Sequence, residues 1–354
     1  MTHLKEVKCV VWDLDNTLWC GTLLEPGDVL LRPGIREVIA ELDGRGILHS
    51  IASRNNYQDA MGKLREWDLH DFFLYPQINW GSKSESIRLI QEKLNIGMDT
   101  IVFIDDQPFE RDEVSESLPE VETFDASTYL DLPALTRMNP RFVTRDSKQR
   151  RIMYQEDMQR VKDEEEYIGP RESFMASLRM RFIISEAEEE DLERAEELTV
   201  RTNQLNATGR TYSYEELYAL MKSDHHKLYV CELTDRYGSY GKIGLALVEM
   251  QADHWCLNML LMSCRVMSRS VGSILLSYIM QRARQDGKKL LAHFKQTDRN
   301  RMMYVTYRFS NFSELTNDGH GNIVFANDLS QVQGFPPYVE VMTPGAAGFP
   351  HSQA

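Results

Sequence analysis

The chain has 354 residues, 42% of them hydrophobic and 27% charged, which is typical of a globular protein and excludes a disordered or collagen-like chain. At roughly 150 residues per domain, it is long enough for two domains. Its 40 Lys and Arg against 54 Asp and Glu give a net charge of −14, which argues against nucleic acid or an anionic membrane as a partner. Residues 256–264, the longest apolar stretch, are too few to cross a bilayer, and we expect a cytoplasmic protein.

The first third of the chain alternates apolar runs with amphipathic patterns, which predicts a parallel β-sheet with helices on both faces. The predicted strands are residues 7–12, 47–52, 72–75 and 101–104, and the predicted helices include residues 35–42, 60–67 and 87–94. In such a sheet, ligands bind beyond the carboxyl ends of the strands.

Residues 145–166 are almost half charged, and Gly169-Pro170 then interrupts the pattern, which predicts a helical linker. Beyond it we expect an α+β domain with its main helix in the middle. The predicted strands are residues 180–185, 228–233, 243–249, 255–262 and 290–294, with a turn at 237–241. The predicted helices cover residues 192–198, the segment opened by a capping box at Ser213 and Glu216, residues 272–284 and residues 300–309.

The predicted fold class is therefore α/β, with a doubly wound parallel sheet followed by an α+β domain. The expected boundaries are 1–137 for the first domain, 138–178 for the linker, 179–345 for the second domain and 346–354 for a disordered tail. The five cysteines are odd in number and contain no CxxC pair, so we expect reduced thiols and neither a disulfide framework nor a zinc site.

Polar side chains gather at the predicted strand ends of the first domain. They are Asp13 and Asp15 after the first strand, Ser53, Arg54 and Asn55 after the second, and Asp105 and Asp106 after the fourth. Because the carboxyl ends of parallel strands converge, we expect these residues to line one crevice together with Lys83. Clustered carboxylates repel one another and are most easily held together by a hard cation such as Mg²⁺, which also binds phosphate oxygens. The pattern predicts phosphoryl chemistry.

The chemistry of each residue type suggests its role. Asp13 is expected to attack phosphorus and form an aspartyl phosphate, and Asp15 to protonate the leaving oxygen and then activate water. Ser53 would hydrogen-bond the phosphoryl oxygens, and Lys83 would offset their charge. The predicted Mg²⁺ ligands are Asp13, Asp15, Asp105 and Asp106. The predicted substrate-binding residues of this crevice are Arg54 and Asn55.

Residues 12–18, Trp-Asp-Leu-Asp-Asn-Thr-Leu, resemble motif one of the haloacid dehalogenase (HAD) superfamily, and Ser53, Lys83 and Asp105-Asp106 match its later motifs. Residues 51–55, 103–111, 201–206 and 297–302 resemble the FkbH-like family, and the likeness covers nearly the whole chain. It implies a HAD domain joined to an N-acetyltransferase-like domain. It also implies conversion of 1,3-bisphosphoglycerate into a glyceryl thioester on an acyl carrier protein for polyketide biosynthesis.

The implied reaction needs a thiol as well as a phosphate site, because sulfur is nucleophilic near neutral pH and its thioester can be passed on. Cys20 is the first choice, since it follows Asp15 by five residues in the segment where HAD proteins place a flap. Cys264, before the central helix of the second domain, is the second choice. Cys9, Cys231 and Cys256 lie within predicted strands and are expected to be structural.

In the second domain, Arg269-Ser270-Val271-Gly272 resembles the acetyltransferase pyrophosphate loop, but the branched Ile274 stands at a position where the backbone should approach pyrophosphate. This leaves the phosphopantetheine arm of a carrier protein as an alternative occupant. The arginines expected to meet an acidic carrier surface are Arg265, Arg269, Arg299 and Arg301. The polar run Asn203, Gln204, Asn206 and Thr208 either orients a hydroxylated acyl group or forms a plain loop.

The leading hypothesis is a glyceryl transferase with phosphatase activity, acting on a small phosphorylated substrate and an acyl carrier protein. One alternative is a Mg²⁺-dependent phosphatase without acyl transfer. Another is a non-catalytic docking protein for carrier proteins. The clustered charges around Asp13 count against this alternative, because a docking protein does not need them. An acetyl-coenzyme-A-dependent acyltransferase is a fourth alternative, weakened by Ile274.

Overall fold

The structure is a computed structural model that describes residues 5–269 and 271–345. Two compact units divide the chain, Met1–Gln155 and Glu156–Ala354, and each is described by itself. Their boundary falls within the predicted linker, inside helix α6 (Arg150–Glu166). The predicted tail 346–354 and Ser270 lie outside the described residues. Among the residues that the structure describes, no helix is both long and apolar enough to span a membrane.

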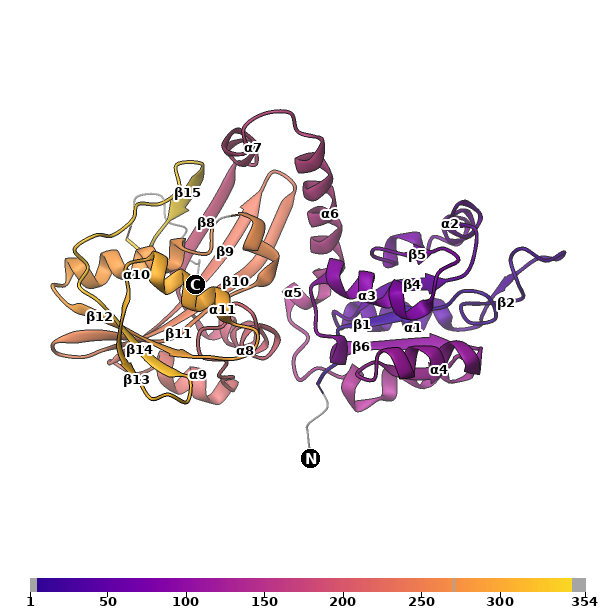
Figure 1. Ribbon diagram of the computed structural model, residues 1–354, viewed down its shortest axis with the longest axis horizontal. Coiled ribbons are helices and arrows are strands. Elements are labelled where there is room, and N and C mark those ends of the chain that lie inside the picture. The colour runs from indigo at the N-terminus through magenta and orange to yellow at the C-terminus, as the bar shows by residue number, and fades with distance from the viewer. Residues whose placement is uncertain (1–4, 270, 346–354) are drawn as a thin grey trace. The chain divides into compact units, whose positions relative to one another are not determined.

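The N-terminal unit contains the predicted parallel sheet, with strand order β5-β4-β1-β6-β7 (Figure 1). Its strands are β1 (Cys9–Trp12), β4 (Leu48–Ser53), β5 (Gln77–Ile78), β6 (Ile101–Asp105) and β7 (Glu122–Asp125). Every residue of β1, β4 and β6 is buried, as expected for strands covered on both faces. A short antiparallel pair, β2 (Trp19–Cys20) and β3 (Leu30–Leu31), follows β1 and is called the flap below.

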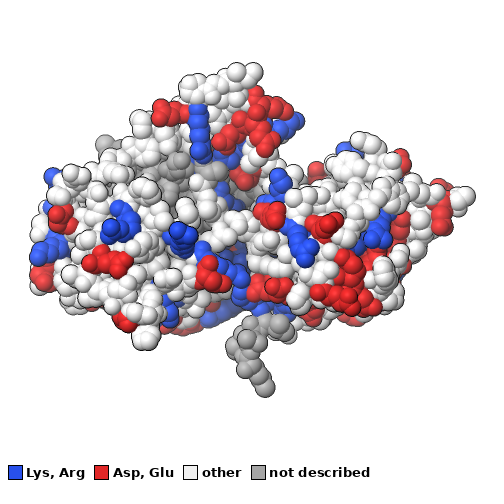
Figure 2. Space-filling view, in the orientation of Figure 1, with Lys and Arg blue, Asp and Glu red and all other residues white. Residues whose placement is uncertain are grey.

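Helices cover both faces of this sheet. One face packs against α1 (Ile35–Gly44), α2 (Tyr57–Glu66) and the 3₁₀ helix η3 (Ala126–Ala134) in one apolar core. Helices α3 (Lys83–Leu94) and α4 (Pro108–Ser117) contact each other and cover the other face. Acidic side chains gather over α4 (Figure 2), where Asp112 and Glu116 are exposed. The remaining short helices are η1 (His70–Phe72), η2 (Met98–Thr100), η4 (Thr136–Met138) and α5 (Arg145–Lys148).

The predicted strand at residues 72–75 is wrong. Only Phe73 makes a bridge to β4, at His49, and Tyr75 then adopts a positive φ of 50°, which no strand residue has. The edge strand β5 instead begins at Gln77 and pairs with Ala52 and Ser53. Strand β7 and helix α4 were not predicted.

The C-terminal unit contains the predicted α+β fold, built on a mixed sheet of strand order β13-β14-β12-β11-β10-β9-β8-β15 (Figure 1). Its strands are β8 (Met180–Glu186), β9 (His226–Asp235), β10 (Gly238–Met250), β11 (His254–Met262), β12 (Lys289–Lys295), β13 (Ser313–Asn317), β14 (Asn322–Asn327) and β15 (Val339–Met342). The predicted turn at 237–241 is shorter than expected, because β10 already begins at Gly238. Asp235 Oδ1 closes the tight turn by accepting hydrogen bonds from the backbone N–H groups of Tyr237 and Gly238.

The two faces of this sheet have separate apolar cores. Helices α7 (Arg171–Ser177), α10 (Ile274–Gln285) and α11 (Arg301–Phe309) contribute to one core, and α8 (Leu192–Arg201) and α9 (Tyr214–Met221) contribute to the other. The short helices η5 (Glu189–Asp191) and η6 (Cys264–Arg269) complete the unit. Helix α10 connects β11 to β12. These two strands are parallel, and parallel neighbours need a crossover connection of this kind.

A short segment of the chain fills the gap where β11 and β12 diverge. The two strands pair only as far as Leu257 and Ala292. Beyond that point Ala207 bridges them: its N–H donates to Leu260 O at 2.9 Å, and its carbonyl accepts from Lys295 N–H at 3.0 Å. Asn300 donates from Nδ2 to Lys295 O at 2.8 Å. The sheet is therefore continuous through this inserted segment, residues 205–207.

Candidate active site

Lys83 is the centre of the polar group at the carboxyl end of the N-terminal sheet. Its side chain is almost fully buried, and its Nζ lies 2.5 Å from Asp13 Oδ1, 2.9 Å from Asp105 Oδ2 and 2.8 Å from Glu110 Oε2. Nζ also donates to the carbonyl of Ala52 at 3.0 Å. The Ser82 hydroxyl caps α3 and so fixes where the lysine emerges. The three carboxylates raise the pKa of Lys83 although burial alone would lower it.

Asp13, Asp105 and Glu110 form a buried acidic cluster. One carboxylate oxygen from each lies within 4.8 Å of the others. Lys83 and Arg54, whose Nη1 lies 3.1 Å from Glu110 Oε1, leave one of the three carboxylate charges uncompensated. Burial and the neighbouring Asp13 raise the pKa of Asp105 to about 7, and burial raises the pKa of Asp13, against hydrogen bonds from Lys83 and Ser53. A cluster of oxygen ligands with excess negative charge fits a hard divalent cation.

Asp15 does not join this cluster, because its carboxylate is held by the flap and by the loop after β4. Oδ1 accepts hydrogen bonds from Trp19 Nε1 at 2.7 Å and from Leu23 N–H at 3.0 Å. Oδ2 accepts from Asn55 Nδ2 at 3.0 Å. Only Leu14 separates Asp15 from Asp13, so this arrangement places a second, independently oriented carboxylate beside the buried cluster.

The other predicted residues of this crevice lie around the same strand ends. Asp106 accepts at Oδ1 from the Thr17 hydroxyl at 3.5 Å and is not part of the acidic cluster. Arg54, predicted to bind substrate, lies with Nη1 3.1 Å from Glu110 Oε1. Ser53 is buried at the end of β4 and hydrogen-bonds Asp13. The structure thus brings Asp13, Ser53, Lys83 and Asp105 together, with Arg54 beside them through Glu110.

The prediction missed Glu110. It lies in the stretch 103–111 that carried the family resemblance, but no role was assigned to it because it follows β6 by five residues, inside α4 rather than at a strand end. Glu110 is only 5% exposed, which is unusual for a glutamate. The first turn of α4 aims it back at the sheet, which a strand-end rule does not anticipate.

The cysteines divide as the sequence suggested. Cys20 is the one exposed cysteine of the five and lies in the flap, next to Trp19. Cys264 is half-buried in η6. Cys9, Cys231 and Cys256 are buried within strands, and burial raises the pKa of each, to about 11 for Cys256.

The residues predicted to contact a carrier protein are not alike in the structure. Arg269 is fully buried, and its guanidinium pairs with Glu164 at 3.0 Å and with Asp157 at 3.2 Å on α6. The prediction that Arg269 meets a carrier protein is therefore wrong, because the side chain is buried and its charge is compensated by two carboxylates inside the unit. Asn203 is exposed, and Arg265 is half-buried with Nε 3.4 Å from Ser263 Oγ. Arg299 and Arg301 are exposed.

Asn206 is likewise structural rather than available to an acyl group. Its side chain is buried, and Oδ1 accepts from the backbone N–H groups of Thr208 at 3.2 Å and Gly209 at 3.0 Å. It therefore shapes the loop that follows the inserted segment.

The sheet orders and the strand-end residues define a HAD-like N-terminal unit and an α+β C-terminal unit built on a mixed sheet. Magnesium-dependent phosphatase 1 of Homo sapiens is 30% identical to this chain over 119 residues, which cover 28% of this chain and 68% of that protein. The chain therefore belongs to the family of magnesium-dependent phosphatase 1. No family model matches the chain.

Two solved structures are similar to parts of the chain. The N-terminal part of protein BF1531 from Bacteroides fragilis, containing a phosphatase domain complexed with Mg, is 33% identical and covers 38% of this chain, with a TM-score of 0.32. The chain spans 40% of the length of that structure. The ribosomal-protein-S18-alanine N-acetyltransferase from Escherichia coli is 16% identical and covers 43% of this chain and 96% of its own, with a TM-score of 0.34.

Proposed function

We propose that the N-terminal unit is a Mg²⁺-dependent phosphatase that acts on a small phosphorylated substrate through an aspartyl phosphate on Asp13. The observation that carries this proposal is the buried cluster of Asp13, Asp105 and Glu110 around Lys83, with Asp15 held beside it by separate hydrogen bonds. Bound Mg²⁺ supplies charge neutralisation for the phosphoryl oxygens. Asp13 and Asp105, together with Glu110 or Asp106, would bind the Mg²⁺ ion. The residual negative charge of the cluster favours a divalent cation at this position.

In the first step, an Asp13 carboxylate oxygen attacks phosphorus and the bond from phosphorus to the ester oxygen breaks. Asp15, in its protonated form, gives its proton to that leaving oxygen. In the second step, Asp15 as carboxylate takes a proton from water while the water oxygen attacks phosphorus. The Asp13–phosphorus bond breaks and inorganic phosphate leaves. Lys83 and Ser53 stabilise the phosphoryl oxygens in both steps.

Two aspartate variants test this proposal. With Mg²⁺ and a panel of small phosphate monoesters, Asp13→Asn is expected to lose phosphate release by about a thousandfold or more, because it lacks the nucleophile. Asp15→Asn is expected to gain one phosphoryl group by intact mass, because hydrolysis of the aspartyl phosphate is slowed. Release of phosphate by Asp13→Asn at the wild-type rate would contradict the proposal. No release by the wild type with any ester would favour the docking-protein alternative.

A more specific proposal is glyceryl transfer to an acyl carrier protein, with Cys20 as the acyl-bearing thiol. What supports it is that Cys20 is exposed on the flap and adjacent to Trp19, which hydrogen-bonds Asp15. The Cys20 thiolate would attack the acyl carbon of 1,3-bisphosphoglycerate and release the acyl phosphate as inorganic phosphate. The thiol of the carrier's phosphopantetheine arm would then take the acyl group and free Cys20, while the Asp13 site hydrolyses the remaining phosphate ester.

This specific proposal is tested by intact mass of both proteins. The chain is mixed with Mg²⁺, freshly generated 1,3-bisphosphoglycerate and a phosphopantetheinylated carrier protein. We expect a glyceryl adduct on the carrier that is lost with Cys20→Ser and kept with Cys264→Ser as the matched control. Phosphate release without a mass gain on either protein would leave the phosphatase and reject the transfer. Loss of the glyceryl adduct with Cys264→Ser alone would identify Cys264, in the C-terminal unit, as the acyl-bearing thiol.

A further inference from the structure

The two oxygens of the Asp15 carboxylate are held by different parts of the N-terminal unit. The flap, with the segment that joins its two strands, supplies two donors to Oδ1: the Trp19 indole N–H at 2.7 Å and the Leu23 backbone N–H at 3.0 Å. The loop after β4 supplies one donor to Oδ2, which is Asn55 Nδ2 at 3.0 Å. The carboxylate is therefore held asymmetrically, with two donors on one oxygen and one on the other.

The Trp19 indole is fixed by packing that does not involve Asp15. Its side chain is fully buried in the same apolar core as α1 and α2. Its ring centre lies 5.6 Å from that of Trp67, and its backbone pairs with Leu31 across the flap. A ring in a close-packed core has little freedom to turn. The indole therefore orients the carboxylate, and the carboxylate does not orient the indole.

The Asn55 amide is also fixed independently of Asp15. Its side chain is 1% exposed, and its Oδ1 accepts a hydrogen bond from the Asn56 backbone N–H at 3.0 Å. Because Oδ1 is engaged in this way, Nδ2 is the end of the amide that faces Asp15. The amide thus holds Oδ2 from the sheet side while the indole holds Oδ1 from the flap side.

We propose that Trp19 is a positioning residue that makes Oδ2 of Asp15 the atom carrying the transferred proton. A carboxylate oxygen has two lone pairs, and Oδ1 already accepts two N–H groups, whereas Oδ2 accepts one. The proton therefore binds at Oδ2, and Asn55 is a second positioning residue that holds this oxygen. The inference rests on the function proposed for Asp13 and Asp15, because it concerns the acid and base of that reaction.

The proposal assigns one atom to both proton transfers. In the first step, the O–H bond at Oδ2 breaks as the proton passes to the leaving ester oxygen, and in the second step Oδ2 takes a proton from the attacking water. Without the indole N–H, Oδ1 keeps only the Leu23 donor and either oxygen can carry the proton. The proton is then misplaced for a leaving group that needs it, but a leaving group that departs as a stable anion is unaffected.

Two esters that differ in this need test the proposal on the full chain with Mg²⁺. Trp19→Phe keeps a buried ring and removes the N–H. For the alkyl ester of the panel with the highest turnover, kcat/KM is expected to fall by about tenfold to a hundredfold, as for a misplaced catalytic group. For 4-nitrophenyl phosphate, kcat/KM is expected to change by less than about twofold. With this ester, the aspartyl phosphate of Trp19→Phe is expected to accumulate by intact mass, because the second step still needs Oδ2.

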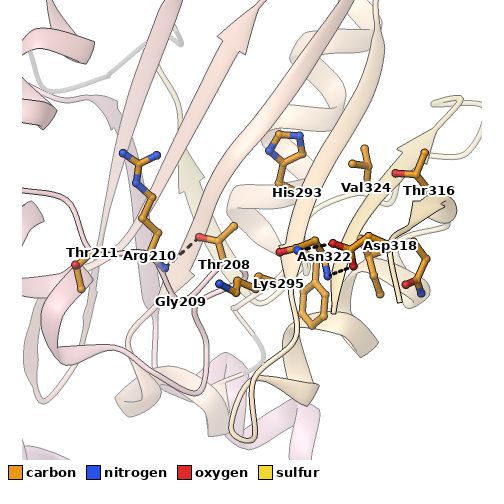
Figure 3. Close-up of a pocket in the computed structure, with 13 residues that line it drawn as sticks. Thr208, Gly209, Arg210, Thr211, His293, Lys295, Thr316, Asp318, Asn322 and Val324 are labelled. Atoms are coloured by element: carbon orange, nitrogen blue, oxygen red, sulfur yellow. Dashed lines mark hydrogen bonds between the residues drawn. The ribbon is translucent and has the colours of Figure 1, made fainter. Parts of the chain in front are cut away.

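A second variant and two matched controls accompany Trp19→Phe. Asn55→Ala removes the donor to Oδ2 and is expected to show the same difference between the two esters. Trp67→Phe alters the other ring of the pair and removes no donor to Asp15. Asn322→Ala removes an amide that donates to Asp318 in the C-terminal unit, in a pocket of about 800 Å³ (Figure 3). Both controls are expected to keep kcat/KM within about twofold of the wild type for both esters.

The outcomes separate this inference from the function on which it rests. An equal loss with both esters in Trp19→Phe would overturn the inference, because a merely structural role slows every substrate. An unchanged kcat/KM for the alkyl ester, or the same loss in Trp67→Phe, would also overturn it. In each of these cases the wild type remains a phosphatase. A wild type that hydrolyses neither ester would instead reject the proposed function itself.

Discussion

At the scale of single residues, the N-terminal site depends on one lysine shared by three carboxylates. Lys83 is 2% exposed and contacts Asp13, Asp105 and Glu110, whereas Arg54 contacts the cluster only through Glu110. Removing one partner of a buried ion pair leaves an uncompensated charge in a medium that solvates it poorly. The stability of this unit and its affinity for a cation are therefore linked through Lys83.

We predict that Lys83→Met destabilises the chain by about 3–5 kcal/mol without Mg²⁺. Mg²⁺ is expected to restore more stability to this variant than to the wild type, because it replaces the lost positive charge. Denaturant unfolding with Mg²⁺ and with EDTA measures both effects. Lys93→Met, at an exposed lysine near the end of the same helix α3, is the matched control, and an equal loss in the two variants would contradict this account.

The sequence indicated Asp13, Ser53, Lys83 and Asp105 because residues at strand ends must converge in a parallel sheet. It did not indicate Glu110, whose position depends on the direction of α4. Nor did it indicate that Arg269 is buried, because only tertiary packing brings Asp157 and Glu164 of α6 to it.

At the scale of elements, a buried histidine joins two strands and a helix of the N-terminal unit. His49 on β4 accepts a hydrogen bond at Nδ1 from Trp12 Nε1 of β1 at 3.0 Å, and its Nε2 lies 3.1 Å from Ile39 O of α1. Burial, aided by the charge of Arg151, lowers the pKa of His49 to about 3. The folded protein therefore keeps this imidazole neutral where the unfolded chain would protonate it.

This histidine makes folding depend on pH in a defined direction. The folded pKa of His49 is depressed, so its contribution is complete above the unfolded pKa of about 6.5 and is lost progressively as the pH falls toward 3. Between pH 7.5 and 5.5, the wild type is predicted to lose about 1.4 kcal/mol more stability than His49→Gln. Urea unfolding at both pH values measures the difference, with the exposed His320→Gln as a composition control. Equal losses in wild type and His49→Gln would refute the assignment.

The regular elements were predictable where the pattern was long. The buried strands β1, β4 and β6 and the amphipathic α1 gave clear periodicities. The edge strand β5 has only two residues, and β13 is exposed throughout, so neither has an apolar pattern to detect. The inserted segment 205–207 was also not predicted, because its pairing partners β11 and β12 lie far away in the sequence.

At the scale of the whole molecule, helix α6 contributes to both compact units. Tyr154 donates to Leu94 O at 3.0 Å within the N-terminal unit. Arg160 is fully buried in the C-terminal unit, where it binds Asp235 at 2.7 and 2.9 Å and lies over the ring of Tyr240. The residues of the proposed phosphatase site, by contrast, all lie between positions 13 and 110.

We predict that Arg160→Met destabilises the C-terminal unit by about 3–5 kcal/mol, because the buried Asp235 loses its cation. Phosphatase activity is expected to remain at the wild-type level below the unfolding transition. Fluorescence-detected unfolding and phosphate release measure the two properties on one sample. The exposed Arg282→Met is the control for loss of an arginine, and a parallel loss of activity in Arg160→Met would show that the phosphatase needs the C-terminal unit.

Hydrogen–deuterium exchange of two backbone amides reports how firmly the inserted segment is held in the C-terminal sheet. Met262 donates its amide proton to Leu205 O and Lys295 donates its own to Ala207 O, at 2.9 and 3.0 Å. These two amides would face an open gap between β11 and β12 if the segment were absent. They should exchange only when the segment leaves the sheet, so their exchange rates report directly how often the chain opens this seam.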